Sequence, residues 1–338
     1  MIPFNSIEVI DCLEGLKKLP DECVQTCITS PPFYRLRDYN VKGQVGMEPT
    51  PAAYIARLVE IFTEVKRVLC KDGTVWLNLG DTYNAHKATI GAAGHSLRKW
   101  GLLDPSLKNK DLIGIPWRVA LALQSAGYYL RQDLIWHKPN PMPESVKDRC
   151  TKAHEYIFLL TRSERYYFDQ EAIKQPLRES SKKRLAQDIE NQKGISRVPG
   201  KTNGKMKAAG HVVGGKKVER YKFVVGNKPG YFQNRNANGK PWKSLDGTCN
   251  KRSVWVVANQ VFKENHFATF PEALIKDCVK AGSRTGDLVL DPFMGAGTTA
   301  LVAVELGRNY LGFELNAGYK AIAQRRLRER LRTVSGGP

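Results

Sequence analysis

The sequence lacks the features of a metal-binding, secreted or membrane-spanning protein. None of its seven cysteines forms a C-x-x-C pair, so their spacing indicates neither a zinc site nor a disulfide framework. No stretch approaches the roughly 18 consecutive apolar residues that a membrane-spanning helix needs. The first residues also lack the charged lead and apolar core of a secretory signal. We therefore predict a cytoplasmic protein with reduced cysteines and no metal site.

Acidic residues are scarce relative to basic ones. The 338 residues include 53 Lys and Arg against 33 Asp and Glu, which gives a formal net charge of +20. Residues 171–252 alone hold 20 Lys and Arg against 6 Asp and Glu, a net charge of +14. Aromatic side chains such as Tyr221 and Trp242 lie between these charges, whereas disordered linkers are usually poor in aromatics. The balance favours a polyanionic partner, and it favours a nucleic-acid-reading insertion at 171–252 over a solvated linker.

Apolar runs alternate with segments of helical spacing along the rest of the chain. In 51–69, Tyr54, Leu58 and Ile61 recur on one helical face. Patterns typical of buried strands occur at 24–29, 74–79, 130–136, 156–160, 253–257, 287–290 and 310–313. This alternation predicts an α/β, doubly wound and mainly parallel Rossmann-like sheet with helices on both faces. We expect the basic insertion 171–252 to separate two parts of this domain, 1–170 and 253–338.

A glycine-rich turn follows the strand pattern near the C-terminus. The stretch Asp291–Thr299 reads D-P-F-M-G-A-G-T-T and combines a strand end, a turn and a helix start. Doubly wound folds bind nucleotides at such a place. Gly295 and Gly297 let the backbone approach a ligand closely, and the helix that begins near Thr298 points its first amides there. Glu314 ends the next strand, where its carboxylate can accept hydrogen bonds from ribose hydroxyls.

A second motif, Ser30-Pro31-Pro32-Phe33, ends a strand pattern near the N-terminus. The Ser30 hydroxyl and the Pro31 carbonyl are hydrogen-bond acceptors on a stiff turn, and Phe33 offers a flat face for a base. An exocyclic amino group needs such acceptors, because its lone pair stays delocalised until its hydrogens are drawn out of the ring plane. Taken alone, the motif also suits an ordinary turn after a strand.

Together the two motifs resemble those of the amino-methylating DNA methyltransferases. Residues 30–33, here called the amino-group motif, come first and the glycine-rich motif comes last. This is the order of the circularly permuted beta class. The resemblance implies catalysis by the four residues Ser30, Pro31, Pro32 and Phe33. It implies S-adenosyl-L-methionine as cofactor, with its ribose at Glu314 and its methionine part at Asp291, Pro292, Phe293, Gly295, Gly297 and Thr298. Residues 1–170 would then form the catalytic half and 253–338 the cofactor-binding half.

Two further places fit the cofactor side of this resemblance. Thr269-Phe270 precedes the glycine-rich turn, where the class has another motif that lines the cofactor pocket. Asp11 resembles the acid that meets the adenine amino group of the cofactor. The same residue suits equally well the N-cap of a helix that begins near Leu13.

Other segments fit the side of the substrate base. Trp136 and Lys138 resemble the part of this class that encloses the flipped base, although Trp136 also suits a core position. Asp81 follows a strand and is a weaker candidate for the site. The run 154–156, His-Glu-Tyr, looks like the family but receives no role from the sequence.

The first residue of the amino-group motif bears on the methylated base. Members of these families with Ser there mostly methylate N4 of cytosine, and members with Asp or Asn mostly methylate N6 of adenine. Ser30 therefore favours a site-specific cytosine-N4 DNA methyltransferase over an adenine-N6 enzyme. An RNA methyltransferase and a non-catalytic DNA-binding protein on the same fold remain as alternatives. The expected partner is double-stranded DNA, while a cognate restriction endonuclease and a homodimer are left open.

Overall fold

The computed structural model describes residues 2–84, 104, 106–181, 247–259 and 270–334, together with four short strands between 212 and 230. The chain divides into two compact units, one of Met1–Ile173 with Arg252–Pro338 and one of Lys174–Lys251. The first unit therefore joins the two ends of the sequence, and the second covers most of the basic stretch 171–252. Of the residues predicted for the site, Thr269 lies outside the described residues.

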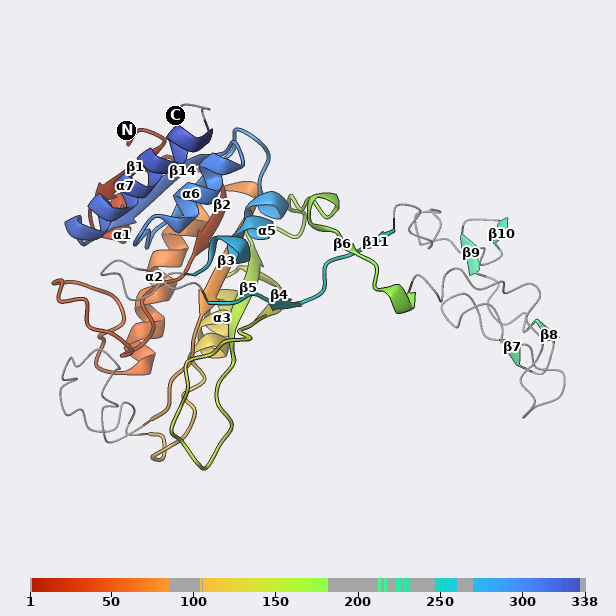
Figure 1. Cartoon of the computed structure of the whole chain (residues 1–338), viewed down its shortest axis with the longest axis horizontal. Helices are drawn as coiled ribbons and strands as arrows, with labels where there is room; N and C mark the ends of the chain where they lie inside the picture. Colours follow the sequence, from red (N-terminus) through yellow and green to blue (C-terminus); the bar gives the residue numbers. More distant parts are fainter. Residues whose placement is uncertain are drawn as a thin grey trace. The chain divides into compact units, whose positions relative to one another are not determined.

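Figure 1 labels the elements along the chain. In the first unit they are β1 (Ser6–Val9), α1 (Cys12–Lys17), β2 (Val24–Thr29), α2 (Pro51–Val68), β3 (Leu69–Leu79), α3 (Ile115–Ser125), β4 (Tyr129–His137), β5 (His154–Thr161), the 3-10 helix η1 (Glu171–Ile173), β12 (Val254–Val256), α5 (Glu272–Gly282), β13 (Leu288–Asp291), α6 (Thr298–Glu305), β14 (Asn309–Glu314) and α7 (Ala317–Val334). Among the described residues, none of the helices has both the length and the apolar character that crossing a bilayer would require.

Among its described residues, the second unit contains three antiparallel strand pairs. They are β6 (Gln175–Pro176) with β11 (Thr248–Cys249), β7 (Val212–Val213) with β8 (Lys216–Lys217), and β9 (Phe223–Val225) with β10 (Lys228–Gly230). The pairing of β6 with β11 brings together the two ends of this unit, where the chain leaves and rejoins the first unit.

The first unit is built on one eight-stranded sheet with the strand order β1-β14-β13-β2-β3-β5-β4-β12. Neighbouring strands are parallel except around β5, which is antiparallel to both β3 and β4. The α/β, doubly wound and mainly parallel sheet predicted from the sequence is therefore confirmed. The antiparallel course of β5 is an addition that hydrophobic patterning does not reveal, because the direction of a strand leaves no trace in its pattern.

Side chains alternate between the two faces of the sheet, so each face has its own core. Val75 and Leu77 on β3 face a core that includes residues of α1, α2 and α3. Trp76, which lies between them, faces the other core with residues of α5, α6 and α7. Helices therefore cover both faces, and Figure 1 shows the first group in red to yellow and the second in blue.

Helix α2 illustrates how the local sequence sets these elements. The side chain of Thr50 accepts a hydrogen bond of 3.1 Å from the N–H of Ala53, which caps the first turn, and Pro51 occupies the start of the helix. The face predicted from helical spacing is the buried one, and it consists of Tyr54, Leu58, Ile61, Phe62 and Val65 together with Pro51 and Val68.

The two motifs meet because β2 and β13 are parallel neighbours and end at the same edge of the sheet. There the side chain of Asp291 is buried and accepts hydrogen bonds of 2.6 Å from the hydroxyls of both Thr29 and Thr299. A third hydrogen bond, 3.0 Å long, comes from the backbone N–H of Phe293. One buried carboxylate therefore connects segments that lie 262 positions apart in the sequence.

This carboxylate makes stability depend on pH in a specific direction. Burial raises the pKa of Asp291 from 3.8 to about 6, although its hydrogen bonds act to lower it. Because the folded protein then binds this proton more tightly than the unfolded chain does, the contribution of Asp291 to stability grows as the pH falls from 7 towards 4. We expect the wild type to gain on the order of 2 kcal/mol relative to Asp291→Asn over this range. Denaturant unfolding of both ligand-free proteins measures the difference, and parallel pH curves would contradict it.

Candidate active site

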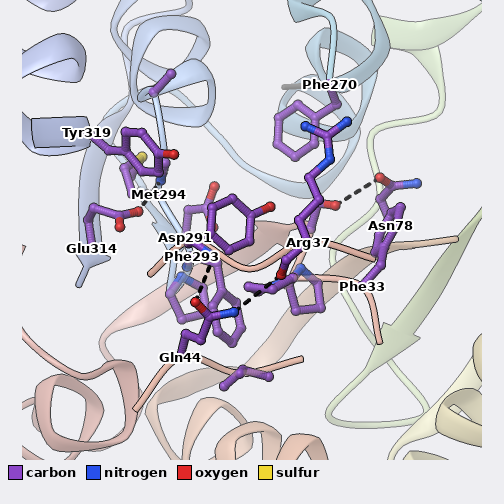
Figure 2. A pocket seen from close by; sticks show the side chains of 18 of the residues that line it. Phe33, Arg37, Gln44, Asn78, Phe270, Asp291, Phe293, Met294, Glu314 and Tyr319 are labelled. Carbon is purple, nitrogen blue, oxygen red and sulfur yellow. Dashed lines mark hydrogen bonds between the residues drawn. The ribbon is translucent and has the colours of Figure 1, made fainter. Parts of the chain in front are cut away.

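A cavity of about 720 Å³ lies at the edge of the sheet where β2 and β13 end (Figure 2). Its lining includes the predicted residues Asp11, Ser30, Pro31, Pro32, Phe33, Trp136, Lys138, Phe270, Asp291, Pro292, Phe293, Gly295, Thr298 and Glu314. Gly297 is adjacent to this lining as the N-cap of α6. The amino-group motif and the glycine-rich turn, which come from opposite ends of the chain, thus open on one cavity.

The glycine-rich turn takes its shape from two residues with positive φ. Gly295 has a φ of 53° and Gly297 a φ of 80°, a region that residues with a side chain rarely adopt. A Cβ atom added to Gly297 would also lie only 2.7 Å from the Cβ of Ala323 on α7. Glycine at position 297 therefore allows helix α7 to pack closely against the turn.

Helix α7 also holds this turn through its arginines. The guanidinium of Arg326 donates a hydrogen bond of 2.5 Å to the carbonyl oxygen of Ala296. Arg330 forms ion pairs with Glu272 of α5 at 2.7 Å and with Glu305 of α6 at 2.6 Å. These two arginines of the basic C-terminal helix therefore connect three helices around the turn.

Glu314 stands at the end of β14 with its carboxylate held in place. One oxygen accepts the N–H of Gly295 at 2.8 Å, and the other accepts the N–H of Asn316 at 2.8 Å. Burial raises the pKa of this carboxyl group, and these two hydrogen bonds oppose the rise. Figure 2 shows Glu314 beside Tyr319, on the same side of the cavity as Met294. Each carboxylate oxygen has a second lone pair with which it can accept a further hydrogen bond.

The sequence left two roles open for Asp11, and the structure shows one of them. It is the N-cap of α1, where its side chain accepts the N–H of Leu13 at 2.9 Å and that of Glu14 at 3.2 Å. Its other oxygen lies 3.6 Å from the guanidinium of Arg57. The N-cap interpretation is therefore correct, and because Asp11 also lines the cavity, contact with a ligand amino group stays a prediction.

The amino-group motif is fixed to its surroundings at both ends. The hydroxyl of Ser30 donates a hydrogen bond of 3.0 Å to the side-chain oxygen of Asn78 on β3. The carbonyl oxygen of Pro32 accepts a hydrogen bond of 2.9 Å from the hydroxyl of Tyr54 on α2. The ring of Phe33 lies against Gly80, where an added Cβ would be 2.5 Å from its Cε2 atom. The motif is thus a turn of defined shape rather than a loose connection.

Asn78 belongs to a polar network that the sequence analysis missed. Its side-chain amide donates hydrogen bonds of 3.1 Å to Glu155 and to the carbonyl oxygen of Tyr156. The other oxygen of Glu155 pairs with the ammonium group of Lys138. These contacts orient the amide of Asn78, so that its oxygen faces Ser30. The run 154–156 had no assigned role, and Glu155 now has one as the partner of both Asn78 and Lys138.

The two residues predicted to enclose a base differ in their exposure. Trp136 is only 3% exposed and belongs to a core cluster, where its indole N–H donates to the carbonyl oxygen of Val257 at 2.8 Å. The ammonium group of Lys138 lies 4.2 Å from the centroid of the Trp136 ring. Both residues line the cavity, so Trp136 is a core residue of which one part borders the site.

Asp81 has a structural role instead of the active-site role considered from the sequence. Its carboxylate accepts the N–H groups of Gly114 and Ile115, each at 3.0 Å, at the start of helix α3. It does not belong to the lining of the cavity among the described residues. A strand end that points towards the expected site was therefore not enough to identify a functional carboxylate.

Comparison with known proteins shows the family to which the chain belongs. Residues 24–325 match the family N6_N4_Mtase, described as DNA methylase. The chain is 38% identical over 322 residues to the type II methyltransferase M.Cfr9I of Citrobacter freundii, covering 94% of this chain and 85% of that protein. It is 37% identical over 329 residues to the type II methyltransferase M.SmaI of Serratia marcescens, covering 96% and 91%.

Solved structures show the same fold. The PvuII DNA methyltransferase, described as cytosine-N4-specific, has a TM-score of 0.57 at 17% identity and covers 99% of this chain and 94% of its own. TTHA0409 of Thermus thermophilus in complex with S-adenosyl-L-methionine has a TM-score of 0.54 at 21% identity and covers 96% and 94%. The predicted methyltransferase fold is thereby confirmed. From the match over residues 24–325 and the extensive identity to type II methyltransferases, we conclude that the chain belongs to the N6 and N4 family of DNA methylases.

Proposed function

We propose that this protein is a site-specific DNA methyltransferase that uses S-adenosyl-L-methionine to methylate N4 of cytosine in a flipped-out base. The observation that carries the proposal is the orientation of Ser30 in the cavity. Its hydroxyl proton is donated to Asn78, so its oxygen lone pairs are left to accept a hydrogen from a substrate amino group. A site of this kind recognises an amine, and the cavity that holds it also presents Glu314.

The groups on the β13 and β14 side of the cavity fit S-adenosyl-L-methionine. Glu314 can accept ribose hydroxyls with the lone pairs that Gly295 and Asn316 leave, and Asp11 can accept from the adenine amino group. Phe270, which lines the same cavity, supplies an apolar surface for the cofactor. The glycine-rich turn from Asp291 to Thr298 remains for the methionine part. When bound, the cofactor supplies a methyl group attached to a positively charged sulfur.

The residues of the amino-group motif prepare the substrate nitrogen. Ser30 and the Pro31 carbonyl accept its two hydrogens and draw them out of the ring plane, which frees the lone pair to point at the methyl group. Phe33, backed by Gly80, stacks on the base and fixes the height of its ring. The base has to leave the helix stack first, because its edge is out of reach inside the duplex.

Cytosine is preferred over adenine because of the residue that opens the motif. Ser30 presents a short neutral acceptor, the choice that predominates in cytosine-N4 enzymes of this type, while Asp or Asn predominates in adenine-N6 enzymes. Adenine N6 is the second candidate, since the cavity offers the same two acceptors to either amine. The RNA methyltransferase and non-catalytic alternatives are less favoured, because the chain belongs to a DNA methylase family and retains both motifs.

Sequence recognition is assigned to the basic unit Lys174–Lys251. The net charge of +14 within 171–252 suits contacts to phosphates, which position a protein on the duplex. A subset of polar side chains would then read base edges in the major groove. The proposed arrangement is that of the beta class, with residues 1–170 as catalytic part and 253–338 as cofactor part. Because its relatives are type II methyltransferases, we further propose a cytoplasmic protein with a cognate restriction endonuclease.

The cofactor assignment predicts a loss of affinity at Glu314. Glu314→Gln removes the charge that strengthens hydrogen bonds to ribose, so binding of S-adenosyl-L-methionine should weaken by about 1–3 kcal/mol. Calorimetry with the whole protein measures this change. Glu60→Gln, on the exposed side of α2, is the matched control and should bind as the wild type does. Equal affinity of all three proteins would exclude Glu314 from the cofactor site.

The chemical assignment predicts that Ser30 and Asn78 act as one unit. Ser30→Ala removes an acceptor, and Asn78→Leu leaves the Ser30 hydroxyl without its partner, so each should slow single-turnover methyl transfer roughly ten- to a hundredfold. The double variant should lose less than the sum of the two effects. Cofactor and DNA affinity should change little, and Ser6→Ala on the edge strand β1 should behave as the wild type. Independent, additive losses would argue against a shared role.

The decisive test of the function is long-read sequencing of DNA from cells that express the protein. We expect N4-methylcytosine in one defined sequence context. N6-methyladenine in such a context would select the second candidate, and unmodified DNA would refute the proposal. The same experiment tests the basic unit: replacing residues 174–251 by a Gly-Ser linker should preserve cofactor binding and abolish methylation in that context. Retention of the parental context would place recognition elsewhere.

A further inference from the structure

The segment 138–153, between β4 and β5, carries the most exposed of the large hydrophobic side chains that the structure describes. Met142 is 70% exposed, whereas Val146 in the same segment is 40% exposed. Single hydrophobic residues are common on protein surfaces, so exposure by itself indicates no role. Met142 also belongs to the lining of the active-site cavity, a place that it shares with Leu36, which is 49% exposed, and to which Val146 does not contribute.

The backbone that presents Met142 is stiff. Met142 stands between Pro141 and Pro143, and each proline ring fixes its own φ at about −65°. Two residues earlier, Asn140 is joined to Asn259 by reciprocal hydrogen bonds. The N–H of Asn259 donates to the side-chain oxygen of Asn140 at 2.8 Å, and the side-chain amide of Asn140 donates to the carbonyl oxygen of Asn259 at 3.2 Å. A side chain on such a support loses little backbone freedom when it enters a partner.

The same segment begins inside the polar network of the active site. Lys138, its first residue, pairs with Glu155. Glu155 in turn accepts from Asn78, and Asn78 accepts from Ser30. Met142 is therefore connected through few residues to the acceptor for the substrate amine. Because Met142 and Ser30 line the same cavity, a duplex whose flipped base enters that cavity lies at the opening that Met142 borders.

The charges of the segment are compatible with a nearby phosphate backbone. Glu144 pairs with Arg149 at 2.6 Å, and Asp148 pairs with Lys110 at 2.6 Å. Both acidic groups are thus matched by cations, while Lys147 is exposed to solvent. A polyanion that approaches this surface meets no excess of negative charge, and Lys147 can contribute to its binding.

We infer that Met142 is a wedge that enters the base stack of DNA at the position vacated by the flipped target base. The inference rests on the proposed function, because only an enzyme that extrudes its base leaves such a gap. Apolar side chains inserted between base steps, methionine among them, replace stacking contacts that the duplex loses. Met142 combines the required properties: an unbranched apolar side chain, high exposure, a stiff support and a place at the cavity. The Met142 side chain fills the gap opposite the base that has lost its pairing partner.

The test compares two duplexes that carry the target sequence found by sequencing. In one the target base is paired, and in the other it faces an abasic site, so that extrusion needs less help. Single-turnover methyl transfer from labelled S-adenosyl-L-methionine is measured for the wild type, Met142→Ala, Met142→Leu and Val146→Ala. Met142→Ala should be roughly tenfold or more slower on the paired duplex and less than about threefold slower on the abasic one. Met142→Leu and Val146→Ala should remain close to the wild type on both.

A fluorescent base analogue at the target position reports extrusion separately from chemistry. Its fluorescence on binding should rise less with Met142→Ala than with the wild type, on the paired duplex only. An equal loss of rate on both duplexes would overturn the wedge, because Met142 would then act on a base already extruded. An unchanged rate on the paired duplex would overturn it as well. Failure of the proposed function looks different: the wild type itself would methylate neither duplex, and the wedge would fall with it.

Discussion

Asp291 ends β13, and its buried carboxylate is the acceptor for hydroxyl groups on β2 and on α6. A buried carboxylate is costly unless it is hydrogen-bonded, so this contact selects the register of the two strands. A slip of one residue would turn Thr29 to the opposite face of the sheet. The register places Ser30, which follows Thr29, on the cavity that the glycine-rich turn also lines. The cofactor motif and the amino-group motif lie close together because the Asp291 carboxylate needs hydrogen-bond donors from both β2 and α6.

Local pattern was enough to predict helix α2 and most strands of the eight-stranded sheet. The two motifs indicated residues that do line one cavity. The buried face of α2 follows from helical spacing alone, and the strands from apolar runs. The network behind Ser30 could not be predicted in this way. Asn78 lies beside Ser30 only because β3 pairs in parallel with β2, with Leu77 opposite Thr29. Glu155 lies near Asn78 only because its strand, β5, pairs antiparallel with β3. Packing across the whole sheet decides which strands become neighbours, and no short stretch of sequence contains that information.

The excess of basic residues serves more than one purpose. In the first unit, Arg326 and Arg330 bind carbonyl and carboxylate oxygens that hold α5, α6 and α7 around the glycine-rich turn. Such pairs are partly buried, so they fix geometry and contribute little to the attraction of a polyanion. The stretch 171–252 has 20 Lys and Arg against 6 Asp and Glu, so acidic residues of the same stretch leave most of its positive charge unneutralised. Net charge alone would not have separated these two uses, because both raise it equally.

In the proposed mechanism, Lys138 links capture of the base to preparation of its amino group. Its ammonium group pairs with Glu155 and lies over the ring of Trp136, which holds the first residue of the segment that presents Met142. Glu155 also fixes the amide of Asn78, and through it the direction of the Ser30 hydroxyl. A shift of this segment against DNA would therefore change the partner of Ser30 as well as the position of Met142. The Ser30 acceptor is useful only while a base occupies the cavity. Because Ser30 and Met142 are connected through Lys138 and Glu155, methyl transfer would depend on correct extrusion of the base.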